Sequence, residues 1–428
     1  MSEFTWGVAT AAYQIEGAVD EDGRSESIWD RFCATPGKVR AGDTGAIACD
    51  FYHRYPEDIE LMRDLGIGAF RFSIAWPRVM PDGRGRVNAA GLDFYDRLVD
   101  DLLAAGIQPF PTLYHWDLPQ ALEDEGGWRS RATAQAFVEY TEAVVARLGD
   151  RVTHWMTHNE PWVVAWLGYG LGVHAPGRTS EQEAVDAAHH VLLSHGWAVE
   201  AIRREAPEAQ VGIVLNLEHV DSASDSEADR AAAWQMDGRA NRWFLDPIFK
   251  GFYPEDVDYS PPVQDGDLAA ISTPIDFLGV NNYFRFVVSE GPTVVELPGV
   301  QRTSMGWEVH PDGLYKLLLR VAKDYAPKAI YVTENGAAFE DVRGHDGSVR
   351  DPERTEYLAG HIDAVWRARK EGAPVEGYFV WSFLDNFEWA EGYSKRFGIV
   401  FVDYPTQERV PKDSFHWFKQ RIRSLQPA

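Results

Sequence analysis

The sequence has little cysteine, little positive charge and no long apolar run. Its two cysteines, Cys33 and Cys49, lie outside any CxxC pattern, which excludes a disulfide framework and favours buried free thiols. Lys and Arg total 41 against 66 Asp and Glu, and the resulting net charge of −25 argues against nucleic-acid or anionic-membrane partners. Since there is no basic N-terminal segment and no apolar run of spanning length, we expect a soluble, cytoplasmic protein.

Metal-ligand motifs and internal boundaries are also missing. His189 and His190 are adjacent and His154 and His158 are four residues apart, but no HxH, HExxH or ligand cluster accompanies them. We therefore expect neither a metal site nor a cofactor. No repeat, low-complexity tract or Pro/Ser-rich linker divides the chain, which predicts a single domain over residues 1–428.

Aromatic residues, in contrast, are plentiful. The chain holds 16 Trp, 17 Tyr and 22 Phe, enough to serve a core, a ligand platform or both. Short apolar segments rich in β-formers recur along it, and runs that are apolar on both faces suit parallel strands covered by helices. Eight such segments are expected as strands: residues 5–11, 69–76, 108–115, 152–160, 211–218, 276–283, 329–336 and 376–384.

The segments between these strands have a helical period. In "PEDIELMRDLG" we expect Pro56 in the first turn and Gly66 as the stop, and "GLDFYDRLVDDLLAAG" ends in the same way at Gly106. A third helix is expected over "RATAQAFVEYTEAVVARLGD". Eight strands alternating with helices predict the α/β class and a single-domain (β/α)8 TIM barrel.

Polar or aromatic residues fall where these strands end, and a barrel of this kind carries its active site at that end. In "THNEPW" the proline is expected to push Glu160 into an extended conformation and so to place a carboxylate at the barrel mouth, with Glu334 of "YVTENG" as its partner. The other residues expected at the strand ends are Gln14, Arg71, His115, Asn159, Asn281, Tyr283 and Trp381.

Each of these residues also has an ordinary structural explanation. A lone glutamate at a strand end is more often a solvated or ion-paired carboxylate, and Arg71 is equally suited to neutralising a buried acid. A lone His115 in "LYHWDLP" is more often a satisfied core histidine, and most aromatics of "FVWSFLDNFEWAEGY" fit a core stripe. Only the convergence of these residues at one end of a barrel favours an active site over these structural roles.

Taken together, the motifs resemble family 1 of the glycoside hydrolases, the β-glucosidase and β-galactosidase group, across nearly the whole chain. Any one motif is a weak pattern, but nine occur in the order of the family. They are "FTWGVATAAYQIEGA", "FRFSIAWPRVMPDGRGRVN", "TLYHWDLPQAL", "THNEPW", "GYGLGVHAPG", "DFLGVNNYF", "MGWEVHPDGL", "YVTENGA" and "YFVWSFLDNFEWAEGYSKRFGIVFVDY".

The resemblance implies a role for each matching residue. Glu160 corresponds to the acid/base, Glu334 to the nucleophile, Asn159 to the residue that binds the sugar 2-hydroxyl, and Arg71 and Tyr283 to groups that contact the nucleophile. The residues expected to bind substrate are Gln14, His115, Trp116, Asn159, Asn281, Tyr283, Trp307, Trp381, Glu388 and Trp389, with Trp162, Leu167, His174 and Trp307 lining the leaving-group entrance.

Two residues depart from the pattern of the family. His158 occupies a variable position where Leu or Phe is frequent, and Asn282 replaces the first tyrosine of a common N-Y-Y triplet. Neither is expected to touch a catalytic group, so the departures concern the details of the sugar-binding subsites and not the chemistry.

The chemistry implied by the resemblance needs two carboxyl groups in different protonation states. In a retaining mechanism they stand about 5–5.5 Å apart; one attacks the anomeric carbon while the other protonates the leaving oxygen. Arg71 and Tyr283 are expected to keep Glu334 ionised, and that charge to raise the pKa of Glu160. An indole such as Trp381 suits the apolar face of a β-glucopyranose.

We therefore expect a retaining exo-β-glucosidase that acts on β-glucosides and cello-oligosaccharides, and also on β-fucosides and β-galactosides. Glu388 in "LDNFEW" favours neutral over 6-phosphorylated sugars, because a carboxylate repels a phosphate. A carbohydrate-binding protein without catalysis, an endo-acting barrel glycosidase and a metal-dependent barrel hydrolase are the alternatives. The sequence leaves open whether the chain forms a homo-oligomer.

Overall fold

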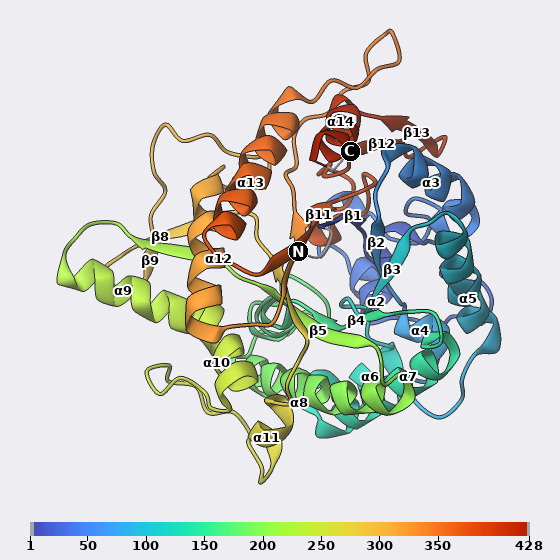
Figure 1. Ribbon diagram of the computed structural model, residues 1–428. Coiled ribbons are helices and arrows are strands. Elements are labelled where there is room, and N and C mark those ends of the chain that lie inside the picture. Colours follow the sequence, from blue (N-terminus) through green and yellow to red (C-terminus); the bar gives the residue numbers. More distant parts are fainter. Residues whose placement is uncertain (1–3, 426–428) are drawn as a thin grey trace.

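The computed structural model describes residues 4–425, and its centre is a closed barrel of parallel strands (Figure 1). All eight predicted strands are present, although each ends earlier than the sequence pattern suggested. Around the barrel their order is β1-β11-β10-β7-β5-β4-β3-β2. Their bounds are Thr5–Ala9 (β1), Ala69–Ser73 (β2), Gln108–Tyr114 (β3), His154–Asn159 (β4), Gln210–Asn216 (β5), Phe277–Asn281 (β7), Ile330–Asn335 (β10) and Val375–Trp381 (β11).

Helices cover the outside of the barrel, as the alternating pattern predicted (Figure 1). The longer ones are Phe51–Leu65 (α3), Ala89–Ala104 (α5), Arg131–Leu148 (α7), Glu181–Glu205 (α8), Glu227–Asp237 (α9), Trp243–Lys250 (α10), Pro311–Tyr325 (α12), Pro352–Lys370 (α13) and Asp413–Leu425 (α14). Shorter ones are Ala12–Ile15 (α1), Ile28–Ala34 (α2), Arg40–Gly42 (η1), Trp76–Val79 (α4), Gln120–Asp124 (α6), Gly127–Arg129 (η2), Val163–Gly170 (η3, a π-helix), Gly238–Arg242 (η4, also π), Asp267–Ile271 (α11) and Trp389–Glu391 (η5).

The predicted start of α3 is wrong, whereas its end is confirmed. The helix begins at Phe51, so Pro56 lies inside it and not in its first turn. Phe51 and Tyr52 are buried, and this burial extends the helix upstream of the local proline signal. Gly66 adopts a left-handed conformation with φ of 84° and ends the helix as expected.

Aromatic rings fill the interior of the barrel. Phe110 of β3 lies 5.2 Å from Phe379 of β11 and 5.7 Å from Tyr331 of β10, measured between ring centroids. Gly7 on β1 makes room for this layer, because a Cβ there would lie 2.4 Å from the Phe379 ring. The interior is therefore a packed core, and a ligand has space only at the ends of the strands.

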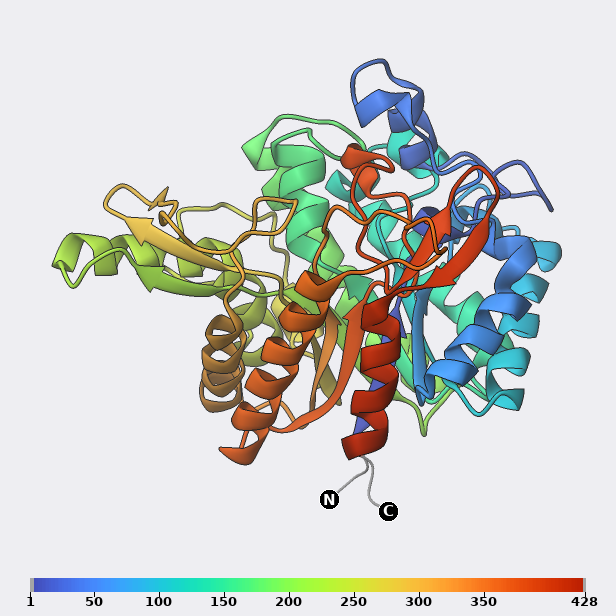
Figure 2. The same cartoon turned by 90° about the horizontal axis from the view of Figure 1, so that it is seen from above.

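Two small sheets that the sequence reasoning did not predict are added to the barrel. His219–Ser222 (β6), Arg285–Ser289 (β8) and Thr293–Val294 (β9) form one, and Val400–Asp403 (β12) pairs with Glu408–Pro411 (β13) in the other. In both views α9 and the β8–β9 hairpin extend away from the barrel (Figures 1 and 2). The β6–β8–β9 sheet continues from the ends of β5 and β7, next to the mouth of the barrel.

The segments that follow β4 and β11 rise at one end of the barrel (Figure 2). The parallel register brings the strand ends level there, since Ala9 pairs with Arg71 and Glu334 with Asn281. Cys33 and Cys49 are buried free thiols, as predicted. Among residues 4–425 no helix combines the length and the apolar character that a membrane crossing requires.

Candidate active site

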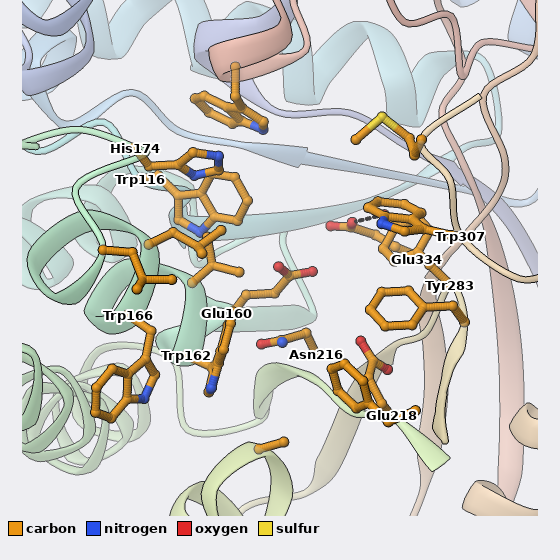
Figure 3. A pocket seen from close by; sticks show the side chains of 18 of the residues that line it. Trp116, Glu160, Trp162, Trp166, His174, Asn216, Glu218, Tyr283, Trp307 and Glu334 are labelled. Carbon is orange, nitrogen blue, oxygen red and sulfur yellow. Dashed lines mark hydrogen bonds between the residues drawn. The ribbon is translucent and has the colours of Figure 1, made fainter. Parts of the chain in front are cut away.

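A cavity of about 490 Å³ opens at the C-terminal ends of the barrel strands (Figure 3). Nine of the residues predicted to be catalytic or to bind the sugar line it, and four others, Gln14, Arg71, Asn159 and Asn281, lie buried behind the lining. The nine are His115, Trp116, Glu160, Tyr283, Trp307, Glu334, Trp381, Glu388 and Trp389. The structure thus brings the predicted residues into one place.

Glu334, near the end of β10, has a partner for each carboxylate oxygen. Arg71 of β2 donates from Nη1 to Oε1 at 2.5 Å, and the Tyr283 hydroxyl donates to Oε2 at 2.5 Å. The Arg71 side chain is fully buried, so its positive charge acts on Glu334 with little screening by water. This ion pair gives Glu334 a buried positive charge as its direct partner.

Glu160 has a different environment, directly after β4. Its Oε1 accepts a hydrogen bond of 2.6 Å from the neutral side-chain amide of Asn281. Burial and, second, the negative charge of Glu334 raise the pKa of Glu160 well above its ordinary value. The cavity therefore holds one ion-paired carboxyl group and one whose pKa is raised.

The expected extended conformation of Glu160 is wrong. Its φ is +48°, in the left-handed region, and Pro161 begins the helical turn that leads into η3. Trp116 and Trp389, which also line the cavity, have φ of +78° and +48°. Such values are strained for residues other than glycine, and they are often found where a side chain has to be aimed into a site.

Asn159 links the two carboxyl groups. Its Oδ1 accepts from Arg71 Nη2 at 2.7 Å and from Asn281 Nδ2 at 3.1 Å, and its Nδ2 lies 3.1 Å from His115 Nε2. Arg71 requires an oxygen on its side, which fixes the orientation of the Asn159 amide and directs Nδ2 toward His115. An amide nitrogen carries two hydrogens, so one remains for a ligand.

Glu388 and Gln14 form a polar group at the inner part of the cavity. Gln14 Nε2 donates to Glu388 Oε2 at 3.3 Å and to the Phe387 carbonyl at 2.9 Å. Burial, reinforced by the charge of Glu334, raises the pKa of Glu388 to about 8. Gln14 Oε1 and His115 Nδ1 are buried without a protein partner among residues 4–425, so both are suited to bind the polar groups of a ligand.

Aromatic rings form the walls beside these polar groups. The His115 ring is nearly parallel to the Trp381 ring, at 6.0 Å and 19°, and to the Trp389 ring, at 6.1 Å and 16°. Gly336 allows Trp381 to take this place, because a Cβ on Gly336 would lie 1.5 Å from the Trp381 carbonyl oxygen. On the other side, Trp307 packs at 5.3 Å against Tyr283.

The four histidines weighed as metal ligands make structural contacts. His158 Nε2 lies 2.8 Å from Ser194 Oγ, and His154 stacks on Phe110. His189 contacts Tyr253 and Asp267, and His190 contacts the Trp128 carbonyl. Within the described residues, no group of three His, Cys, Asp or Glu side chains is placed to hold a metal ion.

Sequence reasoning missed the end of the fifth barrel strand, β5. Asn216 and Glu218 both line the cavity there, and Figure 3 draws them on the side opposite Trp116 and His174. The signal was present in "VLNLE", where two polar residues at a spacing of two follow an apolar run. The expected entrance residues Trp162, Leu167 and His174 line the cavity as predicted. Sequence reasoning also missed the lining residues Val163, Trp166, Leu171, Met236, Arg239, Ala240, Tyr259, Phe284, Phe286, Met305 and Phe397.

A parallel eight-stranded barrel with an ion-paired carboxyl group and a carboxyl group of raised pKa at its mouth, surrounded by indole rings, defines a barrel enzyme of the glycoside hydrolase class. The comparisons with known proteins agree with this class and narrow it. The model of glycosyl hydrolase family 1 matches residues 1–426, and the chain belongs to that family.

Named relatives match along nearly the full length of the chain. The chain is 49% identical to β-glucosidase A of Thermotoga maritima, over 98% of this chain and 97% of that protein. It is 46% identical to a bifunctional β-D-glucosidase/β-D-fucosidase of Bifidobacterium breve, over 98% and 97%. The structure of the Thermotoga maritima β-glucosidase in complex with glucoimidazole superposes with a TM-score of 0.97 at 49% identity, covering 99% of this chain and 98% of that one.

The environment of Glu160 leads to a prediction about its titration. Glu334→Gln removes the negative charge that helps to raise the pKa of Glu160, and it leaves Arg71 unneutralised, which lowers this pKa further. We expect the pKa of Glu160 to fall, while staying above the ordinary value because burial remains. ¹³C NMR titration of labelled glutamate measures the shift; the exposed Glu227→Gln is the control. An unchanged pKa in Glu334→Gln would contradict the electrostatic coupling of the two groups.

Proposed function

We propose that this protein is a retaining exo-β-glucosidase, with Glu334 as the nucleophile and Glu160 as the acid/base. The observation that carries the proposal is the contrast between the two carboxyl groups: Glu334 is ion-paired with Arg71, while Glu160 faces a neutral amide and has a raised pKa. A retaining glycosidase needs this combination of an anion and an acid. Membership of glycosyl hydrolase family 1 supports it.

In the first step Glu334 attacks the anomeric carbon while Glu160 gives its proton to the glycosidic oxygen, and the aglycone leaves as an alcohol. The glycosyl ester on Glu334 forms as the glycosidic bond breaks. In the second step Glu160, now a carboxylate, takes a proton from a water molecule while the water oxygen attacks the anomeric carbon. The ester bond to Glu334 breaks, and the sugar is released with its original configuration. As Glu334 is esterified its charge is lost, which lowers the pKa of Glu160 and suits its change from acid to base.

The inner part of the cavity is the proposed site for a terminal sugar. We assign Trp381 to the apolar face of the ring, and Asn159 to the 2-hydroxyl, where a hydrogen bond strengthens in the transition state. The residues assigned to the other hydroxyl groups are Gln14, His115, Glu388 and Trp389, whereas Asn281 and Tyr283 hold the two carboxyl groups. Trp116 is assigned to an apolar contact with the substrate, because its indole N–H donates to the Asn159 carbonyl at 2.9 Å. A pocket for one sugar unit implies exo action on β-glucosides and cello-oligosaccharides.

The proposal also covers β-fucosides and β-galactosides, and a relative named as a bifunctional β-D-glucosidase/β-D-fucosidase supports the β-fucosides. We further propose that the chain works as one domain over residues 1–428, whose outermost residues lie outside the described part, and that it acts in the cytoplasm.

The assignment of the nucleophile predicts a covalent intermediate. In a 2-deoxy-2-fluoro β-glucoside, the fluorine destabilises the oxocarbenium-like transition states of both steps, while a good leaving group keeps the first step fast. The glycosyl-enzyme is therefore expected to accumulate on Glu334. Peptide mass spectrometry after proteolysis locates the adduct. Labelling of another residue, or release of the α-anomer from a β-glucoside in an NMR time course, would overturn the assignment.

The assignment of the acid/base predicts a dependence on the leaving group. Glu160→Ala is expected to slow the hydrolysis of β-glucosides with poor leaving groups by about 10²–10⁴-fold, because these need a proton in the transition state. Activated aryl glucosides need less help and are expected to lose far less in the glycosylation step. Equal losses across a series of aryl glucosides would show instead that Glu160 has a structural role.

Glu388 predicts discrimination against phosphorylated sugars. A phosphate dianion beside this buried carboxyl group lacks a neutralising cation, because the charges that act on Glu388 are those of Glu334 and Glu391 and its hydrogen-bond donor is the neutral Gln14. We expect kcat/KM for p-nitrophenyl β-D-glucoside to exceed that for its 6-phosphate by at least about 100-fold, because a buried charged group without a partner typically costs about 3 kcal/mol or more. A higher kcat/KM for the 6-phosphate would refute this interpretation of Glu388.

A further inference from the structure

Lys412 is a fully buried lysine that the proposed mechanism does not use. It lies between β13 and α14, outside the cavity lining. The pairing of β13 with β12 brings it to the barrel, since Pro411 pairs with Val400 and Lys412 N donates to the Ile399 carbonyl at 3.0 Å. A buried ammonium group needs partners of opposite charge, so the surroundings of this side chain show what it holds together.

Two aspartates from different loops meet the Lys412 ammonium group. Nζ donates to Asp385 Oδ1 at 2.7 Å and to Asp341 Oδ2 at 2.5 Å. Asp385 belongs to the segment after β11, and Asp341 to the segment after β10. Each aspartate has a second cation, because Arg396 Nη1 donates to Asp385 Oδ2 at 2.6 Å and Arg354 Nη2 donates to Asp341 Oδ2 at 2.7 Å. Lys412 therefore joins two ion pairs into one network.

Both loops carry residues of the proposed active site. Asp385 stands three residues before Glu388, and residues 382–388 belong to no helix or strand. On the other loop, Arg354 Nε donates to the carbonyl of Ala337 at 3.1 Å, three residues after Glu334. Because regular backbone pairing does not fix these segments, the buried side chains that anchor them determine where the site residues lie.

The anchor at Asp385 leaves little freedom to the segment that leads to Glu388. Gly398 N donates to Asp385 Oδ1 at 3.0 Å, and a Cβ on Gly398 would lie 2.0 Å from Asp385 N. Asp385 N donates to the Val400 carbonyl at 2.9 Å. A shift of Asp385 is therefore transmitted along three residues to the carboxyl group of Glu388.

We propose that Lys412 is a positioning residue for sugar recognition: by holding Asp385 against Asp341, it keeps Glu388 in place beside the hydroxymethyl group of the sugar. The inference rests on the proposed function, because Glu388 is assigned there to sugar hydroxyl groups and to discrimination at position 6. Lys412 contacts neither the cavity nor the two proposed catalytic groups, so it acts through Glu388.

The charges of the network allow Lys412 to be replaced. Burial and the charge of Arg354 lower the pKa of Lys412, while Asp385 and Asp341 act in the opposite direction. In Lys412→Met each of the two aspartates keeps an arginine as its partner. No buried carboxylate is left unpaired, so we expect the variant to fold and to lose the connection between the loops.

The test compares two substrates that differ only at the hydroxymethyl group. We would measure kcat/KM for p-nitrophenyl β-D-glucoside and for p-nitrophenyl β-D-xyloside, which lacks this group and has the same leaving group. The wild-type enzyme is expected to prefer the glucoside. Lys412→Met is expected to lower the glucoside/xyloside ratio by about tenfold, the effect of one hydrogen bond, mainly through a loss on the glucoside. Partial unfolding does not change this ratio, because the same folded molecules turn over both substrates.

A second variant and a matched control accompany this substitution. Asp385→Asn keeps the shape of the side chain and removes its charge, and it is expected to lower the ratio in the same direction. Lys419→Met is the control, because Lys419 on α14 is also ion-paired, with Nζ 2.6 Å from Asp64 Oδ1, but lies at the exposed surface. It is expected to leave the ratio unchanged.

A double-mutant cycle shows whether Lys412 acts through Glu388. Glu388→Ala removes the group that contacts the hydroxymethyl group, and it is expected to lower the ratio at least as much as Lys412→Met does. Adding Lys412→Met to Glu388→Ala is then expected to leave the ratio unchanged, because the two effects are not additive. A lysine with a merely structural role would not produce this pattern.

The outcomes separate this inference from the proposed function. A wild-type preference for the glucoside that survives in both Lys412→Met and Asp385→Asn overturns the positioning role and leaves the β-glucosidase assignment intact. A further fall of the ratio in the Glu388→Ala background, an equal fall in Lys419→Met, or a wild-type enzyme without any preference for the glucoside also overturns it. Failure of the wild-type enzyme to hydrolyse either substrate overturns the proposed function itself.

Discussion

The positive charge of Arg71, buried at the mouth of the barrel, is the constraint on which the site depends. A guanidinium without partners there would be strongly destabilising, and removing the partner of a buried ion pair typically costs about 3–5 kcal/mol. Arg71 is satisfied by Glu334 of β10, Asn159 of β4 and, at 3.2 Å, Thr112 Oγ1 of β3. One buried charge on β2 thus ties three other strands together and fixes the positions of two residues of the proposed active site.

The same charge orients a chain of amides that ends at Glu160. Because Asn159 turns its oxygen to Arg71, it can accept from Asn281 Nδ2, and Thr333 donates to Asn281 Oδ1 at 2.7 Å. The Asn281 nitrogen is then directed toward Glu160. Glu334 and Glu160 are the same residue type on one barrel, but the first receives the charge directly and the second only through neutral amides. This difference in environment separates their protonation states.

Much of this arrangement could be predicted from the sequence, because apolar runs bounded by turns define eight strands, and parallel strands in a barrel bring their ends together. What failed depends on interactions between distant segments. Pro56 indicates a helix start locally, but burial of the preceding aromatic residues extends the helix. The residue before Pro161 favours extended backbone, yet the cavity requires Glu160 at positive φ. Asn216 and Glu218 were missed because the fifth strand continues into a sheet that the pattern did not reveal.

The two departures from the family pattern have different physical meanings. His158 is fully buried, lies 2.8 Å from Ser194 Oγ and packs against Phe137 on the outside of β4, so it belongs to the layer between barrel and helices. Asn282 instead donates to Glu218 at the cavity wall. An apolar or aromatic residue at position 282 would leave one oxygen of this buried carboxyl group without its donor. The same amide also donates to the Leu217 carbonyl at 2.8 Å and to the Phe284 carbonyl at 3.2 Å. The amide at 282 therefore supports both the buried acid and the backbone beside it, which gives the departure from the family pattern a physical reason.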